Sequence, residues 1–181
     1  MHLEGNIQEA SKYYQDCLNQ GYEDYRVFSN YGKILRDNGK LKEAEKAYRQ
    51  AIKLKPDFAI AHYNLGNALQ NLGELQEAEI SYRKAIEIKP NYAEAYSNLG
   101  IILKDLGKSQ EAELSCRKAI ELQPILAGAH SNLGTILMDL GKSHEAEISL
   151  RKAIEIKPDY INAAWNLYGL ANSIKEAEEK I

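Results

Sequence analysis

One asparagine recurs along the chain at a spacing that could build a binding surface. Successive copies are 34 residues apart. A carboxamide side chain carries one acceptor oxygen and two N–H donors, so it can bond both the N–H and the C=O of an extended peptide without reading the peptide's side chains. A row of such amides would hold a partner segment by its backbone. The recurring residues are Asn30, Asn64, Asn98, Asn132 and Asn166.

The same amide has a second use, which is to hydrogen-bond neighbouring helices of the protein itself. A recurring residue type is a hypothesis about function and does not by itself choose between the two uses. Both interpretations of the asparagine row therefore stay open at the level of sequence.

Two histidines occupy a position that suggests packing rather than catalysis. His62 and His130 stand where other copies of the repeat carry Phe28 and Tyr96. A lone histidine on an apolar face needs a base or a metal partner before it can do chemistry. We therefore expect both histidines in the core.

The remaining residues predict neither an enzyme nor a bound cofactor. Cys17 and Cys116 lie about three repeats apart, too far to form a disulfide in a stacked array. No Gly-rich phosphate loop, metal-ligand cluster or serine–histidine set is found. We expect no catalytic residue, no metal site and no cofactor.

The elements that position these residues follow the same period of 34 residues. A fixed period of this length is typical of a stacked repeat. Each copy reads as two amphipathic helices; in the first helix His62, Leu65, Gly66 and Leu69 follow helical spacing. All the prolines share one position, after the second helix: Pro56, Pro90, Pro124 and Pro158.

The turns and helix ends also repeat. Gly73 and its equivalents are predicted to end the first helix in the left-handed conformation. Asp57, Asn91 and Asp159 stand just before first helices and are predicted N-caps. On the second helices, Glu79 and Arg83 recur at a spacing of four residues, as in helical ion pairs.

The pattern predicts one continuous all-α solenoid of antiparallel helix hairpins. Irregular ends suggest a fragment of a longer protein, because solenoids need polar capping repeats. The expected segments are 1–24 (a second helix only), the full repeats 25–58, 59–92, 93–126 and 127–160, and 161–181 (a partial repeat or capping helix).

If the leucines of the first helix are buried, its opposite stripe holds the second, sixth, ninth and thirteenth positions of each repeat. These positions share one side of a helix because they are three or four residues apart. We call this stripe, with its immediate neighbours, the first-helix face. Besides the five recurring asparagines, the candidate binding residues on it are Asn67, Asn71, Tyr63, Lys33 and Arg26.

Composition excludes several classes of partner. The net charge is −3 and the pI is about 5.9, which argues against nucleic acid and against a membrane surface, because both require clustered positive charge. No apolar run approaches the ~20 residues that span a bilayer, and the first residues do not read as a secretory signal. We expect a cytoplasmic protein.

The repeat resembles the tetratricopeptide repeat, in which a large residue, Leu-Gly, a hydrophobic residue, Ala, an aromatic residue and Pro follow in order. One copy supplies this pattern as His62, Leu65-Gly66, Leu69, Ala78, Tyr82 and Pro90. The resemblance implies a right-handed superhelix whose first helices line a concave groove for peptides or partner helices.

Phrases such as Ala95-Tyr96-Ser97-Asn98-Leu99-Gly100 are also similar to the repeat arm of the O-linked N-acetylglucosamine transferases. In that family, asparagines at this position contact bound peptide backbone. The dicarboxylate clamp of chaperone-binding repeats is not matched, because Lys33 and Arg26 are isolated in one repeat.

The sequence therefore predicts a protein–protein interaction scaffold that binds a peptide or partner segment in the groove. The alternative is a substrate-presenting or regulatory arm of a larger transferase-type enzyme whose catalytic domain lies outside this chain. Incomplete end repeats also suggest end-to-end self-association.

Overall fold

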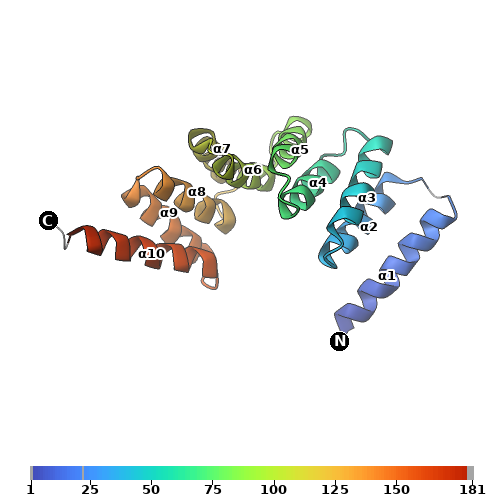
Figure 1. Ribbon diagram of the computed structural model, residues 1–181, viewed down its shortest axis with the longest axis horizontal. Helices are drawn as coiled ribbons and strands as arrows, with labels where there is room; N and C mark the ends of the chain where they lie inside the picture. Colours follow the sequence, from blue (N-terminus) through green and yellow to red (C-terminus); the bar gives the residue numbers. More distant parts are fainter. Residues whose placement is uncertain (1, 22, 179–181) are drawn as a thin grey trace. The chain divides into compact units, whose positions relative to one another are not determined.

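The computed structural model describes residues 2–21 and 23–178. The predicted all-α fold of helix hairpins is confirmed: the described residues form ten helices and no strand (Figure 1). The helices fall into two compact units, Met1–Pro90 and Asn91–Ile181. Positions 1, 22 and 179–181 of the expected end segments lie outside the described residues.

The first unit contains five helices. Neighbours in sequence pack side by side, and α2 also touches α4. The helices are α1 (His2–Asn19), α2 (Tyr25–Asp37), α3 (Leu41–Leu54), α4 (Ala59–Asn71) and α5 (Leu75–Ile88).

The second unit repeats this arrangement. The first helices of successive repeats also touch each other, α6 with α8 and α8 with α10. The helices are α6 (Ala93–Asp105), α7 (Ser109–Leu122), α8 (Ala127–Asp139), α9 (Ser143–Ile156) and α10 (Ile161–Glu178).

Glycine makes the tight turn inside each hairpin, as predicted. Gly73 has φ 78°, a conformation that costs little only without a Cβ. The turn also satisfies carbonyls at the end of α4, since the Glu74 N–H donates to the Leu69 carbonyl at 2.9 Å. The equivalent glycines, all with positive φ, are Gly39, Gly107 and Gly141.

The predicted N-caps are wrong. The residue before α4 is Phe58, and the residue before α6 is Tyr92; neither helix has a side-chain cap bond. Asp57 and Asn91 lie in the turn that follows the preceding proline. Helix α4 therefore begins two residues after Asp57, and α6 begins two residues after Asn91. Among helices α2 to α9 of the described chain, α2 alone has a side-chain cap: the Asp24 side chain accepts from the Arg26 N–H at 2.8 Å.

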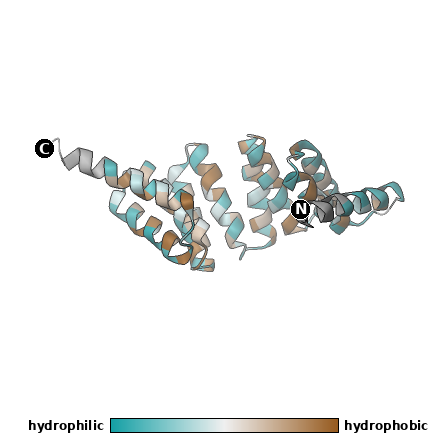
Figure 2. Cartoon of the chain, turned by 90° about the horizontal axis from the view of Figure 1, so that it is seen from below, coloured by the Kyte–Doolittle hydropathy of each residue, from teal (hydrophilic) through white to brown (hydrophobic). Residues whose placement is uncertain are grey.

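The core lies between the two helices of each hairpin. Leu65 and Leu69 of α4 and Tyr82 of α5 are buried. The helices are therefore amphipathic, and Figure 2 shows hydrophobic residues (brown) and hydrophilic residues (teal) on the same helices. No helix in the described part of the chain is long and apolar enough to cross a membrane.

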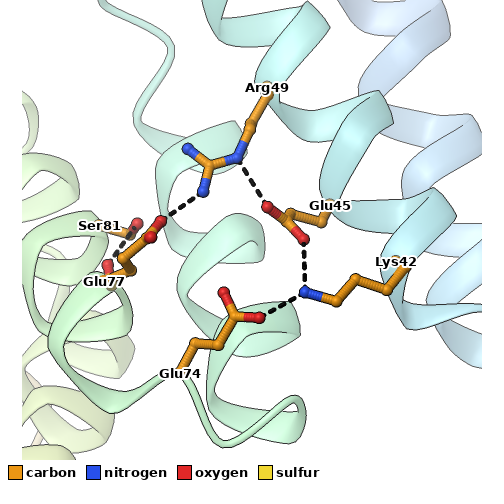
Figure 3. A network of polar contacts seen from close by, with 6 residues as sticks. All are labelled: Lys42, Glu45, Arg49, Glu74, Glu77 and Ser81. Carbon is orange, nitrogen blue, oxygen red and sulfur yellow. Dashed lines mark hydrogen bonds and ion pairs between the residues drawn. The ribbon is translucent and has the colours of Figure 1, made fainter.

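Ion pairs cross from one hairpin to the next on the second helices. In the first unit Arg49 bonds Glu45 of its own helix at 2.8 Å and also pairs with Glu77 of α5 (Figure 3). In the second unit Arg117 bonds Glu113 and Glu145, both at 2.8 Å. The pairing of Glu79 with Arg83, at 2.9 Å, is confirmed.

Candidate functional site

Asn132 is held by its amide nitrogen. On α8, its Nδ2 donates to the backbone carbonyl of Ser97 at 3.2 Å and contacts the Ser97 Oγ at 3.0 Å. A carbonyl oxygen can only accept, so the nitrogen of the amide must face α6. The Oδ1 atom therefore faces away from Ser97 and makes no hydrogen bond with the described residues.

Asn166 is oriented in the same sense. Its Nδ2 donates to the Oγ1 of Thr135 at 2.9 Å. The Thr135 hydroxyl already donates its proton to the Ser131 carbonyl at 3.1 Å, so only its lone pairs are left for Asn166. The oxygen of this amide is again left without a protein partner in the described part of the chain.

These contacts show that two of the asparagines bond the preceding first helix. This is the second of the two uses that the sequence left open. It leaves the acceptor oxygen of each amide for a partner, and Asn166 also keeps one N–H, whereas both donor contacts of Asn132 go to Ser97. Of the other three, Asn30 is exposed, while Asn64 and Asn98 are half-buried. The peptide-binding role of the row stays a prediction.

Asn67 is tied to the core. The hydroxyl of Tyr82 lies 2.8 Å from the Asn67 Oδ1 and 2.8 Å from the Gln70 Oε1. The ring of Tyr63 lies beside the Tyr82 ring, with centroids 6.0 Å apart. Through these contacts Tyr82 of α5 holds Asn67 and Tyr63 of the first-helix face in place.

Arg26 forms an ion pair with Asp24, the residue before its own helix. Its Nη2 lies 2.6 Å from the Asp24 Oδ2, and this guanidinium holds the pKa of Asp24 down at about 2. Lys33 and Asn71 are exposed. Lys33 makes no ion pair with the described residues, which leaves it available to a partner.

The other charges of the first-helix face compensate each other. The Nη2 of Arg36 lies 2.9 Å from the Asp37 Oδ1. In the second unit, the Nζ of Lys104 lies 3.2 Å from the Asp105 Oδ1 and 4.0 Å from the Asp139 Oδ2. The pairing makes most of this surface close to neutral.

Both histidines bond backbone carbonyls, but they are half-buried, so their expected place in the core is wrong. The Nε2 of His62 lies 2.9 Å from the Pro56 carbonyl, and that of His130 lies 2.9 Å from the Pro124 carbonyl. Cys116 is fully buried, and burial raises the pKa of its thiol to about 12. Among the described residues no group of three or more His, Cys, Asp or Glu could hold a metal ion.

The sequence did not predict the hollows between successive second helices. One cavity of about 640 Å³ lies between α7, α8 and α9, with Ile120, Leu133 and Ile148 in its lining. An equivalent cavity of about 430 Å³ lies between α3, α4 and α5. A signal was present, because Ile80 and Ile148 recur on the otherwise charged outer side. None of the predicted site residues lines either cavity.

The chain matches known repeats over most of its length. A family model described as a TPR repeat matches residues 32–73. Models described as the tetratricopeptide repeat match residues 59–92 and 93–125, and residues 127–160. A search of curated protein sequences finds no match.

Solved structures share the fold. The crystal structure of MamA is 25% identical over 87% of this chain and 92% of that chain, with a TM-score of 0.78. YrrB, described as a TPR protein with an unusual peptide-binding site, is 24% identical over 92% of this chain and 86% of that chain, with a TM-score of 0.72.

The Cut9–Hcn1 hetero-tetramer of the APC/C has a TM-score of 0.81 at 17% identity, over 93% of this chain and 34% of that chain. The repeat matches and the helix hairpins agree on one assignment. This chain belongs to the tetratricopeptide repeat family.

Proposed function

We propose that the chain is an interaction scaffold whose first-helix face binds an extended peptide by its backbone. The observation that carries the proposal is the forced orientation of Asn132 and Asn166. Each amide is anchored by its nitrogen to the preceding first helix and offers its oxygen to a partner, and Asn166 also offers one N–H. An extended peptide supplies the matching N–H and C=O groups along its backbone.

Anchoring makes such contacts favourable. An amide already held by Ser97 or Thr135 loses little conformational freedom when a peptide binds. Because most charges on this face are paired within the protein, backbone bonding there has a weak dependence on salt. The scaffold role needs no catalytic group.

The experiment uses a phage-displayed library of random dodecapeptides as the probe. Peptides selected on the wild-type protein are synthesised, and their affinities are compared for wild type and for the variant Asn64→Ala/Asn98→Ala/Asn132→Ala. We expect the triple substitution to weaken binding at least about tenfold, which is the loss of roughly one net hydrogen bond or more.

The control variant is Asn91→Ala, which removes an exposed asparagine in the turn before α6. It is expected to bind the peptides like wild type. Because Asn132 also links α8 to α6, circular dichroism and urea unfolding must show that the triple variant remains folded. If the triple variant is folded and its affinity for the peptides is unchanged, the proposal of backbone binding is wrong.

A further inference from the structure

The apolar hollow of the first unit lies apart from the first-helix face. It is formed between α3, α4 and α5, has a volume of about 430 Å³, and is lined in part by Ile52, Leu65 and Ile80. A volume of this size falls within the range of about 300–1,000 Å³ that ligand pockets occupy. Ile80 is 67% exposed on an otherwise charged side of α5. This exposed isoleucine therefore extends an apolar hollow instead of standing alone on the surface.

The lining of the hollow is held by contacts within the protein. The Pro56 carbonyl accepts from the Nε2 of His62 at 2.9 Å. The Arg49 guanidinium is held by Glu45 of its own helix and by Glu77 of α5 (Figure 3). Because these side chains are already ordered, little conformational freedom is lost when a partner fills the hollow.

The charges that line the hollow favour an acidic partner. They are all cationic: Arg49, Lys53 and Lys84. Within the described residues no carboxylate lines this hollow. Lys53 is exposed and makes no ion pair with the part of the chain that the structure describes. A carboxylate placed at the rim of the hollow would therefore meet a cation that no protein group neutralises.

The equivalent hollow of the second unit differs in this respect. It lies between α7, α8 and α9 and repeats the apolar residues and the histidine, as Ile120, His130, Leu133 and Ile148. At the position of Lys53 it carries Glu121, and Glu155 also lines it. The two hollows thus share an apolar lining, but only the lining of the first is free of carboxylates among the described residues.

We propose that the hollow between α3, α4 and α5 binds an acidic segment of a partner protein, in which a large apolar side chain is flanked by Asp or Glu. The apolar side chain enters beside Ile52 and Ile80, and its burial is the main driving force. A carboxylate of the same segment pairs with Lys53 and Lys84. Lys84 is available because its pair with Glu87 is between exposed side chains, and such pairs are weak.

The test selects phage-displayed random dodecapeptides on the wild-type protein. An excess of the variant Ile80→Gln in solution removes peptides that bind elsewhere. Ile80 is mostly exposed, so this variant is expected to remain folded, which circular dichroism checks. We expect the recovered peptides to carry a large apolar residue next to Asp or Glu. Replacing that apolar residue by Ala is expected to weaken binding at least about tenfold.

Two protein variants test the charge preference. Lys53→Glu installs in α3 the residue that α7 carries as Glu121, and it is expected to weaken binding of the selected peptides about fivefold. Lys12→Glu is the matched control, because it makes the same change of charge at an exposed residue of α1 that does not line the hollow. It is expected to bind within about twofold of wild type. Peptides in which Asp and Glu are replaced by Asn and Gln should bind wild type and Lys53→Glu equally.

The outcomes separate this site from the first-helix face. A selection that yields no peptide dependent on Ile80 would overturn the site. Acidic peptides that bind Lys53→Glu as tightly as wild type would overturn the proposed partner chemistry. The variant Asn64→Ala/Asn98→Ala/Asn132→Ala is expected to bind the selected peptides like wild type. Loss of their binding in the folded triple variant would assign them to the first-helix face, which would overturn this inference and leave the proposed function standing.

Discussion

At the scale of single residues, packing around the glycine of the first helix decides how close the two helices of a hairpin can lie. Gly66 faces the ring of Tyr82, and an added Cβ would be 2.7 Å from the Tyr82 Cε1. Tyr82 cannot withdraw easily, because it is buried and its hydroxyl is bonded to Asn67 and Gln70. The glycine is therefore required for packing.

Gly66→Ala is expected to destabilise the protein by roughly 1–3 kcal/mol, the usual cost of overpacking a core. Gly169→Ala is the matched control, since nothing lies within 4 Å of an added Cβ there. In that helical position alanine is expected to stabilise by up to about 1 kcal/mol. Urea unfolding midpoints measure both, and equal effects of the two substitutions would contradict the packing argument.

Cys116 occupies the position that Tyr48 and Tyr82 fill in other repeats, and its side chain is fully buried. The thiolate is the reactive form of cysteine, and burial raises the pKa of Cys116 to about 12. Cys17 is half-buried.

In the variant Cys17→Ser, the remaining thiol is expected to resist an aromatic disulfide reagent at pH 8 and to react fully in urea. The folded pKa of Cys116 lies above its unfolded value, so its contribution to stability is complete below about pH 8.5 and is lost as the pH rises toward 12. The slope is up to about 1.4 kcal/mol per pH unit. Rapid labelling of the folded variant would contradict this prediction.

At the scale of helices, acidic residues on the second helices join successive hairpins. The Glu113 side chain is 13% exposed and accepts from Lys142, the residue before α9, at 2.8 Å and from Arg117 at 2.8 Å. These bonds, that of Lys142 first, hold the pKa of Glu113 below its usual value. Glu121 of the same helix is 68% exposed, and its one ion pair within the described residues is with Lys118.

Glu113→Gln is expected to lower the free energy of unfolding by about 0.5–1 kcal/mol at pH 7, and Glu121→Gln by less than about 0.5 kcal/mol. Because the folded pKa of Glu113 is depressed, its contribution is present above the unfolded pKa and lost as the pH falls through the folded value. The difference between wild type and Glu113→Gln should therefore shrink at pH 3. Urea titrations at both pH values measure it, and a constant difference would exclude an electrostatic origin.

At the scale of the whole molecule, α10 presents an uncovered apolar surface. Ile161, Trp165 and Tyr168 are 67%, 68% and 63% exposed. Tyr168 stands where other first helices carry the packing glycine, and Lys175 stands where they carry the turn glycine. Without that turn, α10 continues to Glu178.

We propose self-association through this surface, because an exposed aromatic cluster is covered when two copies meet. Light scattering is expected to show an average mass that rises with concentration for wild type, and less so for Trp165→Gln/Tyr168→Gln. The control is Ile80→Gln on α5, which removes a side chain that is 67% exposed elsewhere. A mass that stays monomeric at every concentration would dismiss the proposal. The alternative of a transferase arm stays a prediction, which the gene sequence beyond Ile181 would test.

By itself the sequence determined the local structure of this protein. The period of 34 residues, the glycine at each turn and the apolar spacing specify helix hairpins, because these features act within one or two turns of chain. The same local logic identified Asn132 and Asn166 as candidates but could not decide their partners. It also misplaced the helix starts at Asp57 and Asn91, since the turn after proline competes for the same residues.

The tertiary structure decided which atoms meet across helices. Only the packing of α8 on α6 shows that the nitrogen of Asn132 is used and its oxygen is not. Glu87 gives a second example: Arg83 and Lys84 both lie about one helical turn before it, and it bonds Lys84 at 2.7 Å. Tyr48 is the third, because its buried hydroxyl has no hydrogen-bond partner within the described residues, whereas the hydroxyl of the equivalent Tyr82 has two acceptors on α4. Hydrogen bonds depend on distances of a few tenths of an ångström between separate elements, which sequence periodicity does not encode.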